Sequence, residues 1–375
     1  MSNPHLIVGL VSHIDLPPLM TASHRLSFDP APVDVIFASG ETTSLDPNHP
    51  LSVGYAEILE NLRQANIPGY VELDPGTRSI SRLLIPVPAT VVALVKISGG
   101  DVAVGLEISH AHRILKKANS QFAHLLHVLE DAKKTGATVL VTDTDDHEII
   151  DVRLWETVDT EYETTAMELA AEVLSAGILE LDELAEEGSR GVVSASGLAS
   201  VSSQRLSQLF TWLASKNCNP RTVPPPCIPF LYPDDGCWGR AHEMTRLISS
   251  VGNVPGKVWN YGNLRANTRN NPNCFVRWGW HVTPILAVTG WSEYVVVDPS
   301  MFAKPVKVSE WKKAQQDNAS QIVYTAWQVF YRSRSGQVQY DPTFSQTTKV
   351  LATYRAALKT RSLGPSGPPP YARCR

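Results

Sequence analysis

Residues 227–239 read CIPFLYPDDGCWG and lead directly into the helix-forming stretch Arg240 to Ser250, which ends before Gly252. The Pro-Asp-Asp-Gly sequence at 233–236 is typical of a tight turn, and either aspartate could cap the helix that follows. Cys237 therefore falls at or within the first helical turn. The positive end of the helix dipole favours a thiolate there, which makes this cysteine a candidate nucleophile.

A hairpin is predicted downstream. WGWHVTP (278–284) and YVVVDPSM (294–301) are apolar and β-prone, and the five residues TGWSE between them contain a glycine. A turn centred between Thr289 and Gly290 pairs His281 with Asp298 across the strands, with Cβ atoms about 5 Å apart. A bulge would shift this register, and a one-residue slip would turn one side chain to the opposite face.

A cysteine at a helix start beside a paired His and Asp is what nucleophilic acyl chemistry needs. His281 would take the thiol proton of Cys237 and later protonate the leaving group, while Asp298 would orient the imidazole. The alternatives are a small buried cysteine and a purely structural His–Asp pair. His242 lies five positions after Cys237 and should point away from the thiol, so we interpret it and Glu243 as helix-surface residues.

Length and composition narrow the protein class. Of 375 residues, 43% are hydrophobic and 19% charged, which excludes disordered and fibrous classes and favours two or three globular domains. No apolar run approaches the roughly 20 residues of a membrane span, and the start MSNPHLIVGL does not read as a signal peptide, so the cytoplasm is the expected compartment. Five cysteines are an odd, sparse set, which argues against a disulfide scaffold and favours at least one free thiol.

Charge is divided between the two halves of the chain. Residues 1–200 hold 12 Lys and Arg against 29 Asp and Glu, a net charge of −17, and residues 201–375 hold 21 against 8, a net charge of +13. We therefore expect that the acidic half docks on the basic one, although two independent solvated surfaces are an equal alternative. No dense basic run is present, so neither nucleic acid nor a membrane is an expected partner.

The first half is predicted to be α+β, with a helix near 53–65 and hairpin turns at 74–77 and 99–101. A second helix near 121–134 should end at Gly136. No catalytic constellation is evident in this half. TDTDDHE at 142–148 lacks the glycine and the final glutamate of a calcium loop, so a solvated turn is favoured over a metal site.

Four regions are expected. They are an acidic α+β domain (1–154), an acidic helical connector with a Ser-rich linker (155–203), a catalytic domain (204–350) that begins with a helix near 204–215, and a C-terminal segment (351–375). The end of that segment, RSLGPSGPPPYARCR, is rich in Pro and Gly and should be disordered, with Cys374 an exposed thiol.

These residues also carry a family resemblance. CIPFLYPDDGCWGRAHEM, NNPNCFVRWGWHVTPIL and VVVDPSMF, in that order, closely resemble the bacterial protein-glutaminase family over about residues 220–331. The resemblance implies a papain-like and transglutaminase-like fold, in which a helix bearing the cysteine packs on an antiparallel sheet carrying the histidine and aspartate. It implies that Cys237, His281 and Asp298 form a triad that deamidates glutamine side chains through a thioacyl-enzyme, with the backbone N–H of the cysteine helping to hold the oxyanion.

The resemblance calls for no cofactor and no metal. The substrate would be a glutaminyl carboxamide in a protein, a peptide or a small metabolite. Secreted relatives carry a pro-region that blocks the cleft. The sequence of the acidic half does not match that pro-region, so this half could either inhibit the catalytic domain or recruit its substrate. Aromatic walls suit a carboxamide cleft, and we expect Trp238, Trp278, Trp280 and Asp235 to line it. Under oxidising conditions Cys218, Cys227 and Cys274 are candidates for a disulfide.

Other readings of the same triad remain. The thioacyl intermediate could be resolved by an amine or an internal nucleophile, as in a transglutaminase-like ligase or cyclase. A cysteine protease uses the same chemistry, and an inactive binding module could use the same scaffold. The intact set of Cys, His and Asp favours an enzyme.

Overall fold

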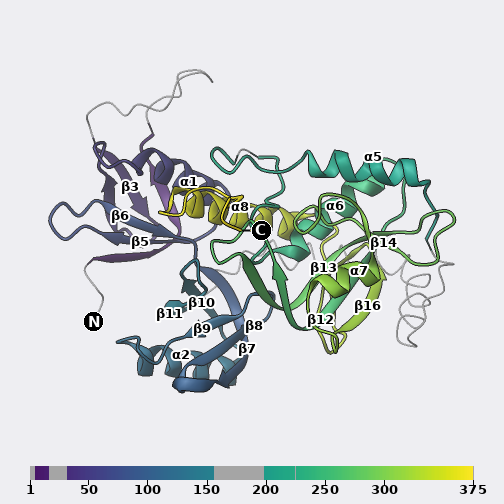
Figure 1. The fold of residues 1–375 in the computed structure, drawn as a ribbon. Helices are drawn as coiled ribbons and strands as arrows, with labels where there is room; N and C mark the ends of the chain where they lie inside the picture. Colours follow the sequence, from purple (N-terminus) through teal and green to yellow (C-terminus); the bar gives the residue numbers. More distant parts are fainter. Residues whose placement is uncertain (1–4, 17–31, 156–197, 224, 375) are drawn as a thin grey trace.

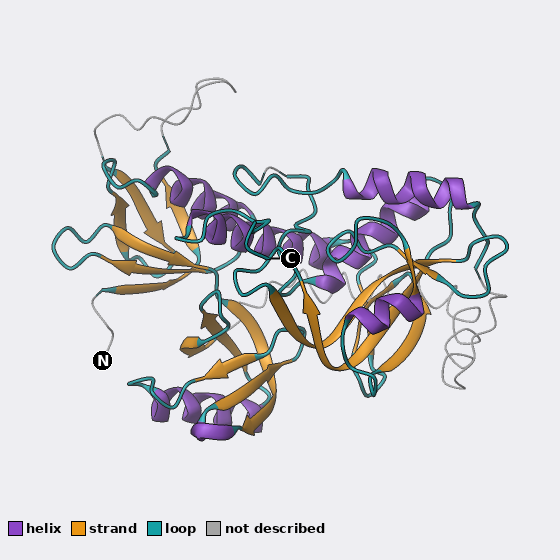
Figure 2. Cartoon of the chain, in the orientation of Figure 1, coloured by secondary structure: helices purple, strands orange, loops and turns teal. Residues whose placement is uncertain are grey.

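The computed structural model describes residues 5–16, 32–155, 198–223 and 225–374 (Figure 1). It is a mixed α/β protein with more strands than helices, as Figure 2 shows. We refer to residues 5–155 as the N-terminal part and to residues 198–374 as the C-terminal part. The expected connector and linker fall mostly at 156–197, outside the described residues. Within the described residues, no helix is both long and apolar enough to cross a membrane.

The N-terminal part, which covers most of the region expected as an acidic α+β domain, contains two hydrophobic cores. One core lies under helix α1 and two small sheets, and the other under helix α2 and a five-stranded sheet of order β11-β10-β7-β8-β9. The first unit comprises β1 (Leu6–Gly9), β2 (Val11–Ile14), β3 (Val33–Phe37), β4 (Thr42–Leu45), α1 (Ser52–Gln64), β5 (Gly69–Leu73) and β6 (Ile80–Leu84). The second comprises β7 (Val87–Lys96), β8 (Val102–Leu106), β9 (Arg113–Leu115), α2 (Phe122–Thr135), β10 (Thr138–Asp143) and β11 (Ile149–Leu154).

The turns and the helix end predicted in this part are confirmed. The turns at 74–77 and 99–101 join the antiparallel pairs β5–β6 and β7–β8. Helix α2 ends at Gly136, whose φ of 74° is the left-handed conformation that closes a helix without a Cβ penalty.

The C-terminal part is built on a five-stranded sheet of order β15-β14-β13-β12-β16, against which helix α6 packs. Its elements are α5 (Ser203–Ala214), α6 (Cys237–Ser250), β12 (Gly256–Asn267), β13 (Phe275–Leu286), β14 (Val295–Val296), β15 (Val306–Lys307), α7 (Val308–Ala314), β16 (Gln321–Ala326), β17 (Val329–Arg332), β18 (Val338–Tyr340) and α8 (Ser345–Leu363). The helix expected near 204–215 is α5. Because α6 packs against β13, the first residue of this helix lies over the middle of that strand.

The register of the predicted hairpin was wrong by two residues. Ile285 pairs with Val296 and Leu286 with Val295, whereas the predicted register would have paired them with Tyr294 and Glu293. Strand β14 has only two residues, and Asp298 lies just beyond it. Because side chains alternate with a period of two, an even shift keeps His281 and Asp298 on the same face.

Helix α8 joins the two parts. In Figure 1 it crosses the middle of the molecule and lies beside α1 at one end and α6 at the other. Ala356 belongs to the core of the first N-terminal unit, whereas Tyr354 and Leu358 belong to a core of the C-terminal part. Lys359 also forms an ion pair with Glu57 of α1. One helix thus contributes to hydrophobic cores of both parts.

The end of the chain is ordered, which corrects the expectation of a disordered tail. Tyr371 is buried, and its backbone N–H donates to the carbonyl oxygen of Arg269 over 2.7 Å. Cys374 is not an exposed thiol, because it forms a disulfide with Cys274.

A second disulfide links Cys218 to Cys227, and Cys237 is the free cysteine. The expectation against a disulfide scaffold was therefore wrong, although Cys218 and Cys227 are two of the three cysteines named as disulfide candidates. The expectation of a free thiol is confirmed.

Candidate active site

Cys237 is the first residue of α6 and is 1% exposed. The residue before it, Gly236, has a φ of 79°, and a Cβ there would overlap the ring of Tyr354. No side chain caps this helix, which corrects the expectation of an aspartate cap. Glycine is required at 236 both by its left-handed backbone and by the close approach of Tyr354.

Beside the cysteine, His281 and Asp298 form a buried pair. His281 Nε2 lies 2.9 Å from Asp298 Oδ2. The same carboxylate accepts hydrogen bonds from Trp311 Nε1 at 3.1 Å and from the Ser300 hydroxyl. Burial alone would raise the pKa of Asp298, but His281 and these two donors together hold it below its ordinary value. The carboxylate is therefore charged and fixes the ring. His281 Nδ1 has no hydrogen-bond partner within the described part of the chain.

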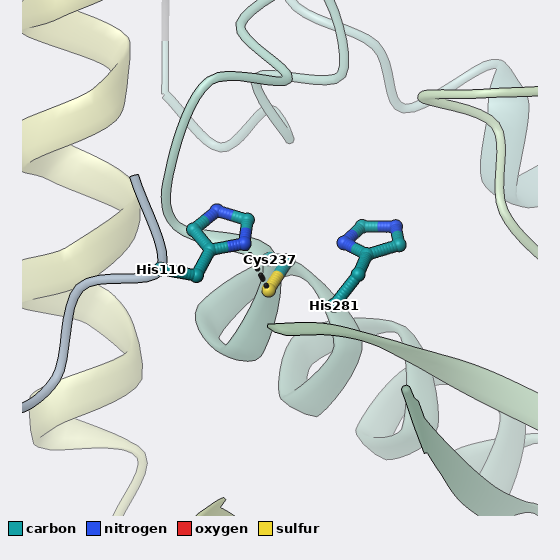
Figure 3. Close-up of side chains that lie close together, drawn as sticks. All are labelled: His110, Cys237 and His281. Carbon is teal, nitrogen blue, oxygen red and sulfur yellow. Dashed lines mark hydrogen bonds between the residues drawn. The ribbon is translucent and has the colours of Figure 1, made fainter. Parts of the chain in front are cut away.

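A third group meets the thiol, and sequence reasoning missed it. His110 lies in the segment 107–113, which connects β8 to β9 in the N-terminal part, and its Nδ1 is 3.3 Å from Cys237 Sγ (Figure 3). Among the described residues, one ligand atom each of His110, Cys237 and His281 lies within 4.8 Å of the others. The pair of histidines in SHAHR at 109–113 was the only local signal, and nothing in its spacing indicates a contact with a distant cysteine.

Segment 107–113 is held in the site through its backbone and its side chains. Ala111 forms an antiparallel bridge with Trp278, and the Gly279 N–H donates to the His110 carbonyl oxygen over 2.9 Å. Tyr331 Oη donates to the carbonyl oxygen of Glu107. The segment thus adds to the edge of β13 as a short strand would.

Asp235 is the main polar anchor of this segment. Its carboxylate accepts from the Ser109 hydroxyl and from the His110 backbone N–H at 3.2 Å, and it pairs with Arg113 at 3.2 Å. Burial would raise its pKa, but His110, Arg113 and Ser109 together lower it. Asp235 was expected to line the cleft, and in this structure residues of the N-terminal part satisfy it.

Burial of the site acts on the thiol and on His110. Desolvation raises the pKa of Cys237 well above its usual value, so the thiol is protonated in this arrangement, contrary to the thiolate expected from the helix dipole alone. Desolvation, together with Arg240 and His281, lowers the pKa of His110 to about 3 against the facing Asp235. His110 is therefore neutral and has one ring proton. Its Nδ1 lies 2.9 Å from the Trp280 carbonyl oxygen, whereas its Nε2 lies 3.3 Å from Asp235 and makes no hydrogen bond among the described residues.

The three tryptophans assigned to the cleft surround these groups. Trp278 stacks on His281 with ring centroids 4.5 Å apart and on His110 at 5.5 Å. Trp238 and Trp280 contact the His110 ring from other directions. All three are 8% exposed or less, so they form an aromatic box that the His110 ring fills.

Further ion pairs join the two parts around Asp234. This buried aspartate pairs with Arg361 of α8 at 2.6 Å and with His147 of the 142–148 turn at 3.5 Å. Arg361 also reaches Asp145 at 3.1 Å. Burial opposes the charge of His147, but hydrogen bonds to Asp143 and Asp234 raise its pKa to about 9. The 142–148 turn is thus an interdomain contact, which corrects its interpretation as a solvated turn.

His242 was wrongly placed on the helix surface. It is 1% exposed, and its Nδ1 lies 2.7 Å from Nζ of the buried Lys257. Burial lowers the pKa of both groups, His242 to about 3. Because no hydrogen bond joins it to the Cys237 thiol, it belongs to the support of α6 and not to the reactive cluster.

The arrangement contains the groups that acyl substitution requires: a thiol, an imidazole and an orienting carboxylate. The imidazole hydrogen-bonded to the thiol in this structure comes from the N-terminal part, however. A carboxamide could reach Cys237 only if segment 107–113 moved, because the His110 ring occupies the space beside the sulfur.

Comparisons with known proteins agree on one family. A family model described as Glutaminase matches residues 206–315. A solved pro-protein-glutaminase is 25% identical, with 78% of this chain and 99% of that chain covered and a TM-score of 0.50. A protein-glutaminase is 32% identical (48% and 100% covered, TM-score 0.36), and the protein-glutaminase of Chryseobacterium proteolyticum is 30% identical (49% and 100% covered, TM-score 0.38). No curated protein sequence matches the chain.

Proposed function

From the premise that the chain belongs to the protein-glutaminase family, we propose that it is a cysteine amidohydrolase that converts a glutamine side chain into glutamate and ammonia. One observation carries the assignment of roles. The start of α6 brings the Cys237 thiol to His281, whose far nitrogen is fixed by the buried Asp298 at 2.9 Å. This is the order of nucleophile, base and orienting group that acyl transfer uses.

In the proposed reaction, His281 Nδ1 takes the proton of Cys237 as the sulfur attacks the carboxamide carbon. The tetrahedral intermediate then breaks its C–N bond, and the imidazolium returns the proton to the leaving nitrogen, which departs as ammonia. A water molecule, deprotonated by His281, attacks the thioester and releases the carboxylate and the thiol. The backbone N–H groups at the start of α6 are suited to hold the oxyanion in both steps.

The N-terminal part is proposed to hold this enzyme in an occluded form. Segment 107–113 pairs with the edge of β13, satisfies Asp235 and fills the box of Trp238, Trp278 and Trp280, which are the positions expected for a substrate. The likeness to a pro-protein-glutaminase supports this assignment. It covers 78% of the chain, more than the C-terminal part contains, so it extends into the N-terminal part.

A protein is the proposed substrate, because the edge of β13 accepts an extended backbone in the way that segment 107–113 uses it. The two disulfides support an oxidising compartment over the cytoplasm that was expected from sequence.

The test is ammonia release from carbobenzoxy-glutaminyl-glycine and from an unfolded glutamine-containing protein. The full chain would carry an engineered protease site within 156–197 and be assayed before and after cleavage. We expect low activity before cleavage and higher activity after it. Cys237→Ala and His281→Asn should each lower the rate of ammonia release by about 10³-fold or more. His124→Gln, which replaces an exposed residue of α2, should leave that rate unchanged.

The products distinguish the other readings. Incorporation of an added primary amine in place of glutamate formation would make the protein a transglutaminase-like acyltransferase. Cleavage of the peptide backbone would indicate a protease. Absence of all three activities from the cleaved protein, with Cys237 still reactive towards iodoacetamide, would refute the proposed amidohydrolase.

A further inference from the structure

The group of His110, Cys237 and His281 has a feature that acyl transfer does not use. The three donor atoms come from the 107–113 segment, the start of α6 and strand β13, and they converge within 4.8 Å (Figure 3). All three side chains are 1% exposed or less. Within the part of the chain that the structure describes, no other three His, Cys, Asp or Glu side chains form such a group.

The outer nitrogens of both imidazoles face carboxylates. His281 Nε2 is 2.9 Å from Asp298, and His110 Nε2 is 3.3 Å from Asp235. Both rings are therefore oriented with Nδ1 towards the sulfur. A histidine whose far nitrogen contacts a carboxylate is the usual arrangement around a protein-bound metal ion.

We propose that His110 Nδ1, Cys237 Sγ and His281 Nδ1 form a site for a thiophilic divalent cation, zinc above all, which binds when segment 107–113 is docked. Thiolate and imidazole are the ligands that zinc prefers, and a water molecule would complete a tetrahedral set. The buried His281 Nδ1 has no hydrogen-bond partner among the residues that the structure describes, and this is the second observation that points to a ligand.

The geometry is close to what such a site needs. Zinc–sulfur and zinc–nitrogen bonds of about 2.3 and 2.0 Å place tetrahedral ligand atoms roughly 3.5 Å apart. Cys237 Sγ and His110 Nδ1 are already 3.3 Å apart, and the widest separation in the group, at most 4.8 Å, would shorten by about 1 Å. Small rotations of two side chains suffice.

Proton balance also fits. Cys237 would release its thiol proton to solvent as the sulfur–metal bond forms. On His110 the proton would move from Nδ1 to Nε2, which lies 3.3 Å from Asp235 without a hydrogen bond in the described part of this structure. A turn of the ring would then replace the hydrogen bond to the Trp280 carbonyl oxygen by the metal on Nδ1 and by Asp235 on Nε2. The thiolate, Asp235, Asp298 and Asp143, which pairs with Arg113, would supply four negative charges, and these would balance the divalent cation together with Arg113 and Arg240.

The metal would act as a lock between the two parts of the molecule. One ligand comes from the N-terminal part and two from the C-terminal part, so binding would hold segment 107–113 over the thiol. That a bound zinc ion would also inhibit the enzyme rests on the proposed function. Metal binding itself does not depend on that function and can be measured without any glutamine substrate.

The experiment titrates the full chain, with its disulfides intact and no reductant present, with Co²⁺ followed by absorbance. We expect one equivalent to produce a thiolate-to-cobalt charge-transfer band and tetrahedral d–d bands, and Zn²⁺ to displace them. Zn²⁺ should also raise the melting temperature. His110→Asn keeps a polar donor near the Trp280 carbonyl oxygen but removes the ligand, and should weaken Co²⁺ binding at least tenfold, as should His281→Asn.

His124→Gln is the matched control, since it removes an exposed histidine of α2 and should leave binding unchanged. A band of equal affinity in His110→Asn would place the metal on Cys237 and His281 alone and refute the lock. Absence of the band in the unaltered chain would refute the site. Either result leaves ammonia release by the cleaved protein, and hence the proposed function, untouched.

Discussion

His110 of the N-terminal part lies 3.3 Å from the sulfur of Cys237, and its ring fills the aromatic box beside that thiol. The backbone of the same residue is held by Gly279 on β13. A residue far away in sequence therefore controls both the access and the electrostatics of the candidate nucleophile. Because burial raises the pKa of the thiol, displacement of segment 107–113 should restore the thiolate that the helix start favours.

Docking of segment 107–113 should weaken in acid. His110 has a pKa of about 3 when docked and an ordinary value of about 6.5 when exposed, so the undocked form binds more protons below pH 6.5. The contribution of His110 to docking is fully present above pH 6.5 and is lost as the pH falls towards 3. The equilibrium constant for docking should decrease by up to about tenfold per pH unit in that range. Hydrogen exchange of the Gly279 amide, corrected for its intrinsic pH dependence, should accelerate between pH 6.5 and 4.

His110→Asn provides the control, because its docking should lose most of this pH dependence. The acidic and basic groups that face the ring (Asp235, Arg240 and His281) remain in that variant. Slower exchange at pH 4.5 than at pH 7 in the unaltered chain would contradict the prediction, and would mean that an imidazolium donates to Trp280 and Asp235 at once.

Arg113 should be a strong determinant of stability. It is 2% exposed and joins Asp143 at 3.0 Å to Asp235 at 3.2 Å. Arg113→Met would remove the arginine that two buried carboxylates share, and we expect a loss of about 3–5 kcal/mol in the free energy of unfolding by urea. Arg153→Met removes a pair with Asp151 in which the arginine is 41% exposed, and should cost less than about 1 kcal/mol. Equal losses would show that the buried pair is no stronger than the surface one.

The sequence predicted what local rules determine. Gly136 ends α2 because a left-handed residue is needed there, and Cys237 begins α6 because a turn precedes a helix-forming stretch. The hairpin register was wrong by two residues, yet His281 still meets Asp298, because the alternation of side chains tolerates an even shift.

Long-range packing was not predictable in this way. No spacing in SHAHR indicates that His110 reaches Cys237, since that contact depends on how the N-terminal part packs against the C-terminal part. The Pro- and Gly-rich end of the chain has the composition of a disordered tail. It is ordered because Cys374 is bonded to Cys274 and Tyr371 is buried, and composition reports neither contact.

Gly236 should tolerate no side chain. Its φ of 79° and the Tyr354 ring against its Cα both exclude a Cβ, so Gly236→Ala should cost about 1 kcal/mol for the backbone and a further 1–3 kcal/mol for overpacking. Gly136→Ala isolates the backbone contribution, because its φ is 74° and nothing lies within 4 Å of the added Cβ. Urea unfolding measures both. If the two variants lost the same stability, Tyr354 would be free to move aside and its contact would not fix the start of α6.

The two disulfides should differ in what they contribute. Cys274 and Cys374 close a loop with a sequence separation of 100, whereas Cys218 and Cys227 close one of 9. In the chain-entropy model the long loop stabilises the fold by about 4–5 kcal/mol and the short one by about 2–3 kcal/mol. Guanidinium unfolding of the Cys274→Ser/Cys374→Ser and Cys218→Ser/Cys227→Ser proteins should show the larger loss in the first. That variant should also expose the Cys237 thiol to iodoacetamide sooner. Asn271, three residues before Cys274, donates to Asp234, and Asp234 holds Arg361 and His147 at the contact between the two parts. A greater loss from the short loop would show that local packing around Cys218, and not chain entropy, determines the contribution of these bonds.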